Sequence, residues 1–184
     1  MPQNKVYISF GRHERYGSDT PIEREDMLAA YLTGTELKNI LPPCATVYHS
    51  PLARAVATAK FEALGLGCTH LLESEFLEES APSFEIKRFL NQVLVNAFAD
   101  EFYYHFVTHL PVVEKLGLPF LGAGEVCLLT ADDWSAMLAE NFTVQVLKKP
   151  PLNAEIWHQV TAEDSLERLS TDEIYARLQK NSIF

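Results

Sequence analysis

The chain has 184 residues and a formal net charge of −10, with 47% hydrophobic and 22% charged residues, a composition typical of globular proteins. This length fits one domain over residues 1–184 with a substantial core. The excess of acidic residues, 25 Asp and Glu against 15 Lys and Arg, argues against nucleic acid or an anionic membrane as partner, because both bind basic surfaces.

The sequence also predicts the compartment. No stretch approaches the roughly 18 apolar residues of a membrane-spanning helix, and the start MPQNKVYISF lacks the apolar segment of a secretory signal. The three cysteines, at 44, 68 and 127, show no CxxC spacing and are typical of reduced thiols. We therefore expect a cytoplasmic protein.

In chain order, the first predicted element is a buried strand, KVYISF (5–10), followed by a helix over 24–34 that ends at Gly34. A second strand over 45–50 precedes an alanine-rich helix over 51–65. A short strand over 69–74 and an amphipathic helix over 83–98, with Ser83 as N-cap, come next.

The second half continues the alternation. A strand over 102–109, a short helix over 111–117 and strands over 124–131 and 142–148 lead to a helical pattern over 164–179, with KKPPLN (148–153) as a loop. Strands that alternate with helices predict an α/β fold of three layers (α/β/α), with a mainly parallel sheet covered by helices on both faces.

Cationic and imidazole side chains follow three of these strands. Arg12 and His13 come after the first strand, Arg54 one turn into the helix after the second, and His109 after the fourth. In open α/β sheets, ligands bind beyond the carboxyl ends of the strands. Each residue has a structural alternative, because a lone histidine is often a satisfied polar group and an arginine at a helix start is usually solvated. Together they form a pocket only if these strands are neighbours.

The chemistry of this set suits a phosphoryl group. Guanidinium groups bind phosphate oxygens in pairs and stay charged at any working pH. A neutral imidazole can attack phosphorus and hold the phosphoryl group covalently. Fixed cations can stabilise the equatorial oxygens, as Mg²⁺ does in many phosphotransferases. We therefore expect no metal and no cofactor.

Four segments carry a family resemblance: GRHER (11–15), DTPIERED (19–26), VYHSPLARAVATA (47–59) and FVTHLPVVEKL (106–116). In order and spacing they resemble the motifs of the histidine phosphatase superfamily, with its phosphoglycerate mutase-like fold. The similarity covers about residues 5 to 130. The compact length is closest to the short phosphohistidine-phosphatase branch.

The resemblance implies roles for individual residues. His13 would be the nucleophile that becomes phosphorylated, and Arg12, Arg54 and His109 would bind the phosphate. The family's general acid is a carboxylate from the segment that ESEFLEES (73–80) occupies, where Glu79 fits best and Glu78 next. The acidic run could equally be a solvated loop, and phosphohistidine has a leaving group good enough to need no acid. The expected substrate is a phosphorylated small molecule or a phosphoprotein.

The sequence departs from the family pattern directly after the nucleophile. The motif has glycine there, whereas this chain has Glu14, and the stretch over 22–26 is also altered. A carboxylate at this position would repel a phosphate dianion unless it pointed away or paired, for example with Arg15 or Arg24. It would also raise the pKa of His13. This departure leaves the fold expectation intact.

Two other interpretations remain. His105 and His109 are four residues apart, which on a helix would suggest a metal pair. On a strand the spacing separates them by about 13 Å, and the aromatic, β-branched surroundings favour a strand. The second alternative is a catalytically weak or inactive phosphate- or phosphopeptide-binding module, in which residues from about 150 onward could form an interaction segment.

Overall fold

The computed structural model describes residues 5–14, 24–97, 101–152 and 170–181. Six strands form one sheet in the order β3-β2-β4-β1-β5-β6. Their bounds are β1 (Val6–Arg12), β2 (Thr46–His49), β3 (Leu71–Glu73), β4 (Tyr103–Thr108), β5 (Val126–Ala131) and β6 (Thr143–Leu147). The first four pair in parallel, whereas β5 is antiparallel to β1 and to β6. The sheet is therefore mixed but mainly parallel.

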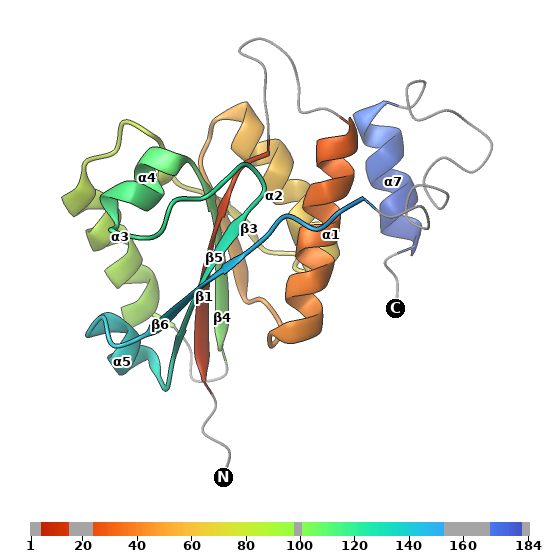
Figure 1. The fold of residues 1–184 in the computed structure, drawn as a ribbon. Helices are drawn as coiled ribbons and strands as arrows, with labels where there is room; N and C mark the ends of the chain where they lie inside the picture. Colours follow the sequence, from red (N-terminus) through yellow and green to blue (C-terminus); the bar gives the residue numbers. More distant parts are fainter. Residues whose placement is uncertain (1–4, 15–23, 98–100, 153–169, 182–184) are drawn as a thin grey trace.

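Helices cover both faces of this sheet (Figure 1). The helices α1 (Arg24–Ile40), α2 (Ala53–Leu66) and α7 (Thr171–Asn181) lie on one side. The other side carries α3 (Ser83–Val95), α4 (Leu110–Lys115) and α5 (Trp134–Leu138), with a short 3-10 helix, η1 (Glu75–Leu77), before α3. This arrangement confirms the predicted α/β fold with helices on both faces of the sheet.

Alternating strand residues supply a core on each face. Ile8 and Phe10 of β1 belong to the apolar cluster that includes Leu94 of α3, and the ring of Phe10 stacks on Phe106 with centroids 5.1 Å apart. A separate cluster packs Val47 and Val107 against the alanines of α2. Burying apolar area on both faces is the main force that holds the layers together.

The end predicted for the first helix is wrong, because α1 continues through Gly34 to Ile40. Gly34 lies where α1 crosses α2, and a Cβ there would collide with the Glu62 backbone, as one at Gly65 would with that of Tyr31. The two glycines therefore permit close packing of the helices rather than ending them. The residue that ends α2 is Gly67, in the left-handed conformation (φ 71°).

Other element boundaries also differ from the prediction. Helix α3 starts at Ser83 with Pro82 as its N-cap, and the Ser83 hydroxyl bonds the Lys115 carbonyl instead of capping. Helix α5, after DD (132–133), has no counterpart in the prediction. In α7, Ile174 and Leu178 are buried and pack in one cluster with Phe61 of α2 and Met27 of α1. This helix thus belongs to the core, while the predicted helical residues 164–169 lie outside the described ones.

In the described part of the chain, no helix combines the length and apolar character needed to cross a membrane. All three cysteines are free thiols.

Candidate active site

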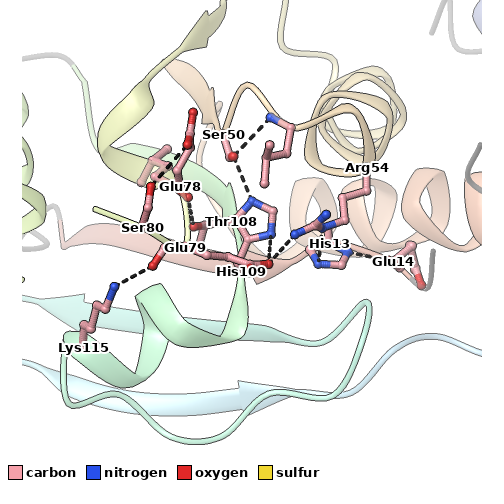
Figure 2. A network of polar contacts seen from close by, with 12 residues as sticks. His13, Glu14, Ser50, Arg54, Glu78, Glu79, Ser80, Thr108, His109 and Lys115 are labelled. Carbon is pink, nitrogen blue, oxygen red and sulfur yellow. Dashed lines mark hydrogen bonds and ion pairs between the residues drawn. The ribbon is translucent and has the colours of Figure 1, made fainter. Parts of the chain in front are cut away.

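The strands predicted to carry the site residues are neighbours in the sheet. The order β2-β4-β1 brings together the residues that follow these strands: His13 after β1, Arg54 in the first turn of α2 after β2, and His109 after β4. Figure 2 shows their side chains converging on one point. The imidazole centroids of His13 and His109 are 4.9 Å apart. The structure thus fulfils the geometric condition on which the sequence prediction depended.

The His13 imidazole has a defined tautomer. Its Nδ1 lies 2.6 Å from the backbone oxygen of Glu14, and because a carbonyl only accepts, Nδ1 carries the proton. Nε2 then holds the lone pair and accepts a hydrogen bond from Nε of Arg54 at 3.2 Å. Burial lowers the pKa of His13, and the charges of Arg54 and Arg12 lower it further, although the Glu14 carbonyl opposes them. The ring is therefore a neutral base with its lone pair at Nε2.

Arg54 also contacts Glu79, which joins it to His109. The Arg54 guanidinium donates to Oε1 of Glu79, and Nδ1 of His109 is 3.3 Å from the same oxygen. The neighbouring Glu78 instead accepts from the Ser80 hydroxyl and lies away from the two imidazoles in Figure 2. Of the two acidic candidates, Glu79 is the one that the fold brings to the histidines.

His109 is fully buried, and its Nε2 is hydrogen-bonded to the hydroxyl of Ser50. The Ser50 oxygen accepts from the Leu52 amide at 3.3 Å and lies 2.8 Å from Nε2 of His109. Nδ1 makes no hydrogen bond within the described residues and faces a carboxylate oxygen of Glu79, which favours the proton on Nδ1. Burial lowers the pKa of His109 to about 3, and electrostatic interactions with His13, Arg54 and Arg12 act in the same direction. His109 is therefore a neutral donor at any ordinary pH.

Arg12 completes the set. It donates through one terminal nitrogen to the Leu121 carbonyl at 2.8 Å, while its buried Nε has no hydrogen-bond partner in the described part of the chain. Buried donors without partners are costly, and here two of them, on Arg12 and His109, belong to residues of the same site. We call Arg12, His13, Arg54 and His109 the anion site, because an oxyanion would offer the acceptors that Nε of Arg12 and Nδ1 of His109 lack among the described residues.

The same place has some features of a metal site. His13, Glu79 and His109 each offer one ligand atom, and these atoms lie within 4.8 Å of one another. Two guanidinium groups, of Arg12 and Arg54, act on the same histidines. Fixed positive charge repels a cation and attracts an anion, so the electrostatics favour an oxyanion over a metal ion.

The segment that carries Glu79 is tied to the sheet and to α4. Lys115 donates through Nζ to the backbone oxygens of Glu79 at 2.6 Å and Ala81 at 2.9 Å. The Thr108 hydroxyl, at the end of β4, donates to the Leu77 carbonyl at 2.7 Å. These bonds fix the backbone on both sides of Glu78, so the carboxylate of Glu79 is presented from an anchored loop.

Glu14 occupies the position of the motif glycine without disturbing the anion site. Its carboxylate lies on the far side of His13 from His109 (Figure 2), is fully buried, and pairs with Nζ of Lys149 at 2.5 Å. Its φ is not positive, so the backbone does not require glycine. Glu14 does act to raise the pKa of His13, but through its backbone carbonyl, and burial outweighs it, so the pKa of His13 is lowered. Arg15, one predicted partner, lies outside the described residues.

His105 and His109 do not form a pair. His105 lies inside β4 and is fully buried, with Nδ1 2.6 Å from the Ser9 hydroxyl and Nε2 2.8 Å from Oε2 of Glu62 in α2. The strand prediction is thus confirmed. His49, at the end of β2, bonds the Ser50 carbonyl at 3.0 Å.

Three contacts of the site were not predicted: those of Ser50, Lys115 and Lys149. Ser50 stands inside the quoted motif VYHSPLARA, so its position was a usable signal. The lysines bond to residues 36 and 135 positions away in the chain, and no local pattern marks them.

No family model and no curated protein matches the sequence. Among solved structures, the fold is similar to that of the protein histidine phosphatase SixA complexed with tungstate, with a TM-score of 0.67 at 17% identity over 78% of this chain and 97% of that one. It is also similar to a mycobacterial glucosyl-3-phosphoglycerate phosphatase (TM-score 0.56, 13% identity, 77% and 97% covered). A phosphoglycerate mutase from Plasmodium falciparum gives a TM-score of 0.52 at 20% identity, with 82% and 95% covered.

These similarities define the class of fold. The chain has the phosphoglycerate mutase-like fold that histidine phosphatases share, and the resemblance seen in the sequence is confirmed at that level.

Proposed function

We propose that this protein is a metal-independent histidine phosphatase of the short phosphohistidine-phosphatase branch, acting on a phosphomonoester or a phosphohistidine. The observation that carries the proposal is the state of His13. Its proton is held on Nδ1 by a carbonyl, its lone pair on Nε2 faces the Arg54 guanidinium, and its lowered pKa keeps it neutral. A nucleophilic nitrogen beside fixed cations is what attack on a phosphoryl group requires.

The reaction has two displacements. Nε2 of His13 attacks phosphorus, the N–P bond forms, and the bond from phosphorus to the leaving group breaks. Water then attacks phosphorus, the N–P bond breaks, and orthophosphate is released. Arg12, Arg54 and the Nδ1–H of His109 bind the equatorial oxygens, whose charge they stabilise in both transition states. The tungstate held by the similar phosphatase is a tetrahedral oxyanion and is consistent with such a site.

Glu79 is the proposed acid and base. It protonates the leaving group in the first step, and its carboxylate then takes a proton from the attacking water. The contacts that support this role, with Arg54 and His109, also mean that the carboxylate occupies the place where phosphate oxygens would bind. Binding of substrate must therefore move Glu79 away from Arg54 before chemistry begins.

Turnover of an aryl phosphate by the wild type and by His13→Ala tests the proposal. We expect activity that the substitution abolishes, together with an acid-labile, base-stable phosphoprotein that forms only with His13 present. The alternative, a phosphate- or phosphopeptide-binding module, predicts no turnover by the wild type but retained binding of orthophosphate. That result would overturn the enzymatic proposal.

A further inference from the structure

The side chain of Lys149 lies between two carboxylates behind the nucleophile. Its Nζ is 2.5 Å from Oε2 of Glu14 and 2.7 Å from Oδ1 of Asp26 in α1. Lys149 follows β6, so the contact with Glu14 joins residues 135 positions apart. The lysine is partly exposed, whereas Glu14 is 0% exposed. A charge carried this far into the interior is expensive unless it is paired.

The Glu14 carboxylate is packed tightly against the backbone of Gly124. Gly124 has φ 73°, and a Cβ there would lie 2.7 Å from Cδ of Glu14 and nearer still to one of its oxygens. Among the residues that the structure describes, Oε1 of Glu14 has no hydrogen-bond partner. Replacing a buried ion pair by apolar groups often costs nothing in stability, so the pair calls for an explanation other than stability.

The backbone contacts of Glu14 offer an explanation for the buried ion pair. The Glu14 amide donates to Oγ1 of Thr58 at 3.1 Å, and Thr58 in turn bonds the backbone oxygen of Arg54 at 2.9 Å. The Glu14 carboxylate is held by Lys149. The backbone carbonyl of Glu14, next to both the held amide and the held side chain, accepts a hydrogen bond from Nδ1 of His13 at 2.6 Å. With both the amide and the side chain held, the Cα of Glu14 is fixed in orientation, and its carbonyl carbon is placed so that the oxygen reaches Nδ1 of His13.

We propose that Lys149 is a positioning residue for the nucleophile: its ion pair with the buried Glu14 carboxylate holds the Glu14 carbonyl against Nδ1 of His13 and so keeps the reactive lone pair on Nε2. The inference rests on the proposed phosphatase function for its catalytic consequence. The family motif has glycine at this position, which offers no side chain to anchor. In this chain the anchored side chain of Glu14 holds the carbonyl that accepts from Nδ1 of His13. Without the anchor, residue 14 can turn, and His13 becomes free to carry its proton on Nε2, where it cannot attack phosphorus.

The direct test is the tautomer of His13, read from its ¹⁵N chemical shifts in the full chain at pH 8, where Glu14, with a pKa of about 7, is mostly ionised. We expect the wild type to be protonated on Nδ1 and Lys149→Met to show a mixture. Lys149→Arg, which keeps the charge and the donors, should restore the Nδ1–H form. The matched control is Lys148→Met, which removes the adjacent lysine and its exposed ion pair with Glu125 and should leave the tautomer unchanged.

Kinetics with an aryl phosphate give the second readout. Small misplacement of a reacting group can cost about 100-fold in rate, so we expect Lys149→Met to lower kcat by about 10- to 100-fold. KM should change little, because the anion site keeps its cations. A merely structural role would instead lower stability, with kcat per folded molecule and the tautomer unchanged.

If Lys149→Met fails to fold, the double variant Glu14→Gln with Lys149→Met takes its place in the tautomer measurement. It removes the fully buried Glu14 charge together with the bridge, so that only Asp26 loses its contact with Lys149, and it should show the mixed tautomer. An Nδ1–H tautomer retained in either variant overturns the inference. The tautomer measurement needs no turnover, so an inactive wild type would contradict the proposed function while leaving the positioning role open to the same test.

Discussion

Nε of Arg54 donates to Nε2 of His13 over 3.2 Å, so the guanidinium covers the lone pair that the proposed reaction uses. An incoming phosphoryl group must displace this hydrogen bond and can take the guanidinium as its own partner. The same arginine bonds Glu79. One planar side chain therefore contacts the proposed nucleophile and the proposed acid, and only a forked cation can do both.

Replacing Arg54 by lysine should keep the charge and lose this geometry. We expect kcat/KM for an aryl phosphate to fall by about 10²- to 10³-fold, since removing one preorganised transition-state donor has effects of that size. The control is Arg88→Lys on the exposed surface of α3, which should be neutral. A loss below tenfold for Arg54→Lys would contradict its place in the anion site.

The two histidines of the site should titrate below the ordinary value of 6.5. Burial and positive neighbours lower both pKa values, that of His109 to about 3. Since a lowered pKa keeps the neutral form as pH falls, we expect His13 to become half-protonated below pH 6.5 and His109 to show no titration above pH 5. NMR signals of both rings, followed from pH 8 to 5 and compared with the urea-unfolded chain, measure this. A midpoint for either ring above 6.5 would refute the electrostatic description.

Removing Lys115 should impair acid catalysis selectively. Lys115→Met frees the backbone that presents Glu79 without touching the anion site. Because protonation matters most for poor leaving groups, we expect kcat for an alkyl phosphate to fall about tenfold more than kcat for a nitrophenyl phosphate. Lys60→Met, on the exposed surface of α2, serves as the control. Equal losses on both substrates would show that the loop anchor does not act through Glu79.

Two glycines with the same backbone conformation allow the cost of backbone strain to be measured apart from the cost of a steric clash. Gly117 and Gly124 have φ of 72° and 73°, but a Cβ at Gly117 meets nothing within 4 Å, whereas one at Gly124 meets the Glu14 carboxylate. Gly117→Ala should cost about 1–2 kcal/mol from the left-handed backbone alone, and Gly124→Ala should cost more. Denaturant unfolding measures both. Measured against Glu14→Gly alone, the further change Gly124→Ala should cost as much as Gly117→Ala does in the wild type, and a larger cost would place the strain elsewhere.

Glu14 should make the folded state less stable as the pH rises from 4.5 to 7. Burial raises its pKa to about 7 despite Lys149, and Asp26 and Glu62 add to the effect. The unfolded chain releases this proton near pH 4.5, while the folded chain holds it to about pH 7, so ionisation weakens folding across that window. Relative to Glu14→Gln, the wild type should lose roughly 3 kcal/mol between pH 4.5 and 7. Parallel stability profiles of the two proteins would contradict the raised pKa.

Much of the site was accessible from sequence because parallel strands end at one edge of a sheet. The predicted strands place four residues on that edge: Arg12, His13, Arg54 and His109. The resemblance in the order of the motifs indicated that the strands before these residues are neighbours, as the sheet order β2-β4-β1 shows. Gly34 was misread because a glycine late in a helical pattern resembles a C-terminal stop, whereas the helix crossing that requires it is a tertiary feature. Lys149 was missed for a similar reason: its partners are distant in the chain, and its local context, KKPPLN, indicates only a loop.

The reversed direction of β5 extends the set of residues that can act on the anion site. Because β5 runs against β1, the connection before it, with the Leu121 carbonyl and Gly124, reaches the edge where β1 ends. The second reversal, in β6, returns the chain to that edge at Lys149. A fragment ending at Leu116 would contain every residue of the anion site, yet it would lack the acceptor for Arg12 and the cation behind His13. Substitutions in the last third of the chain can therefore change the surroundings of Arg12 and His13 without altering a residue of the anion site.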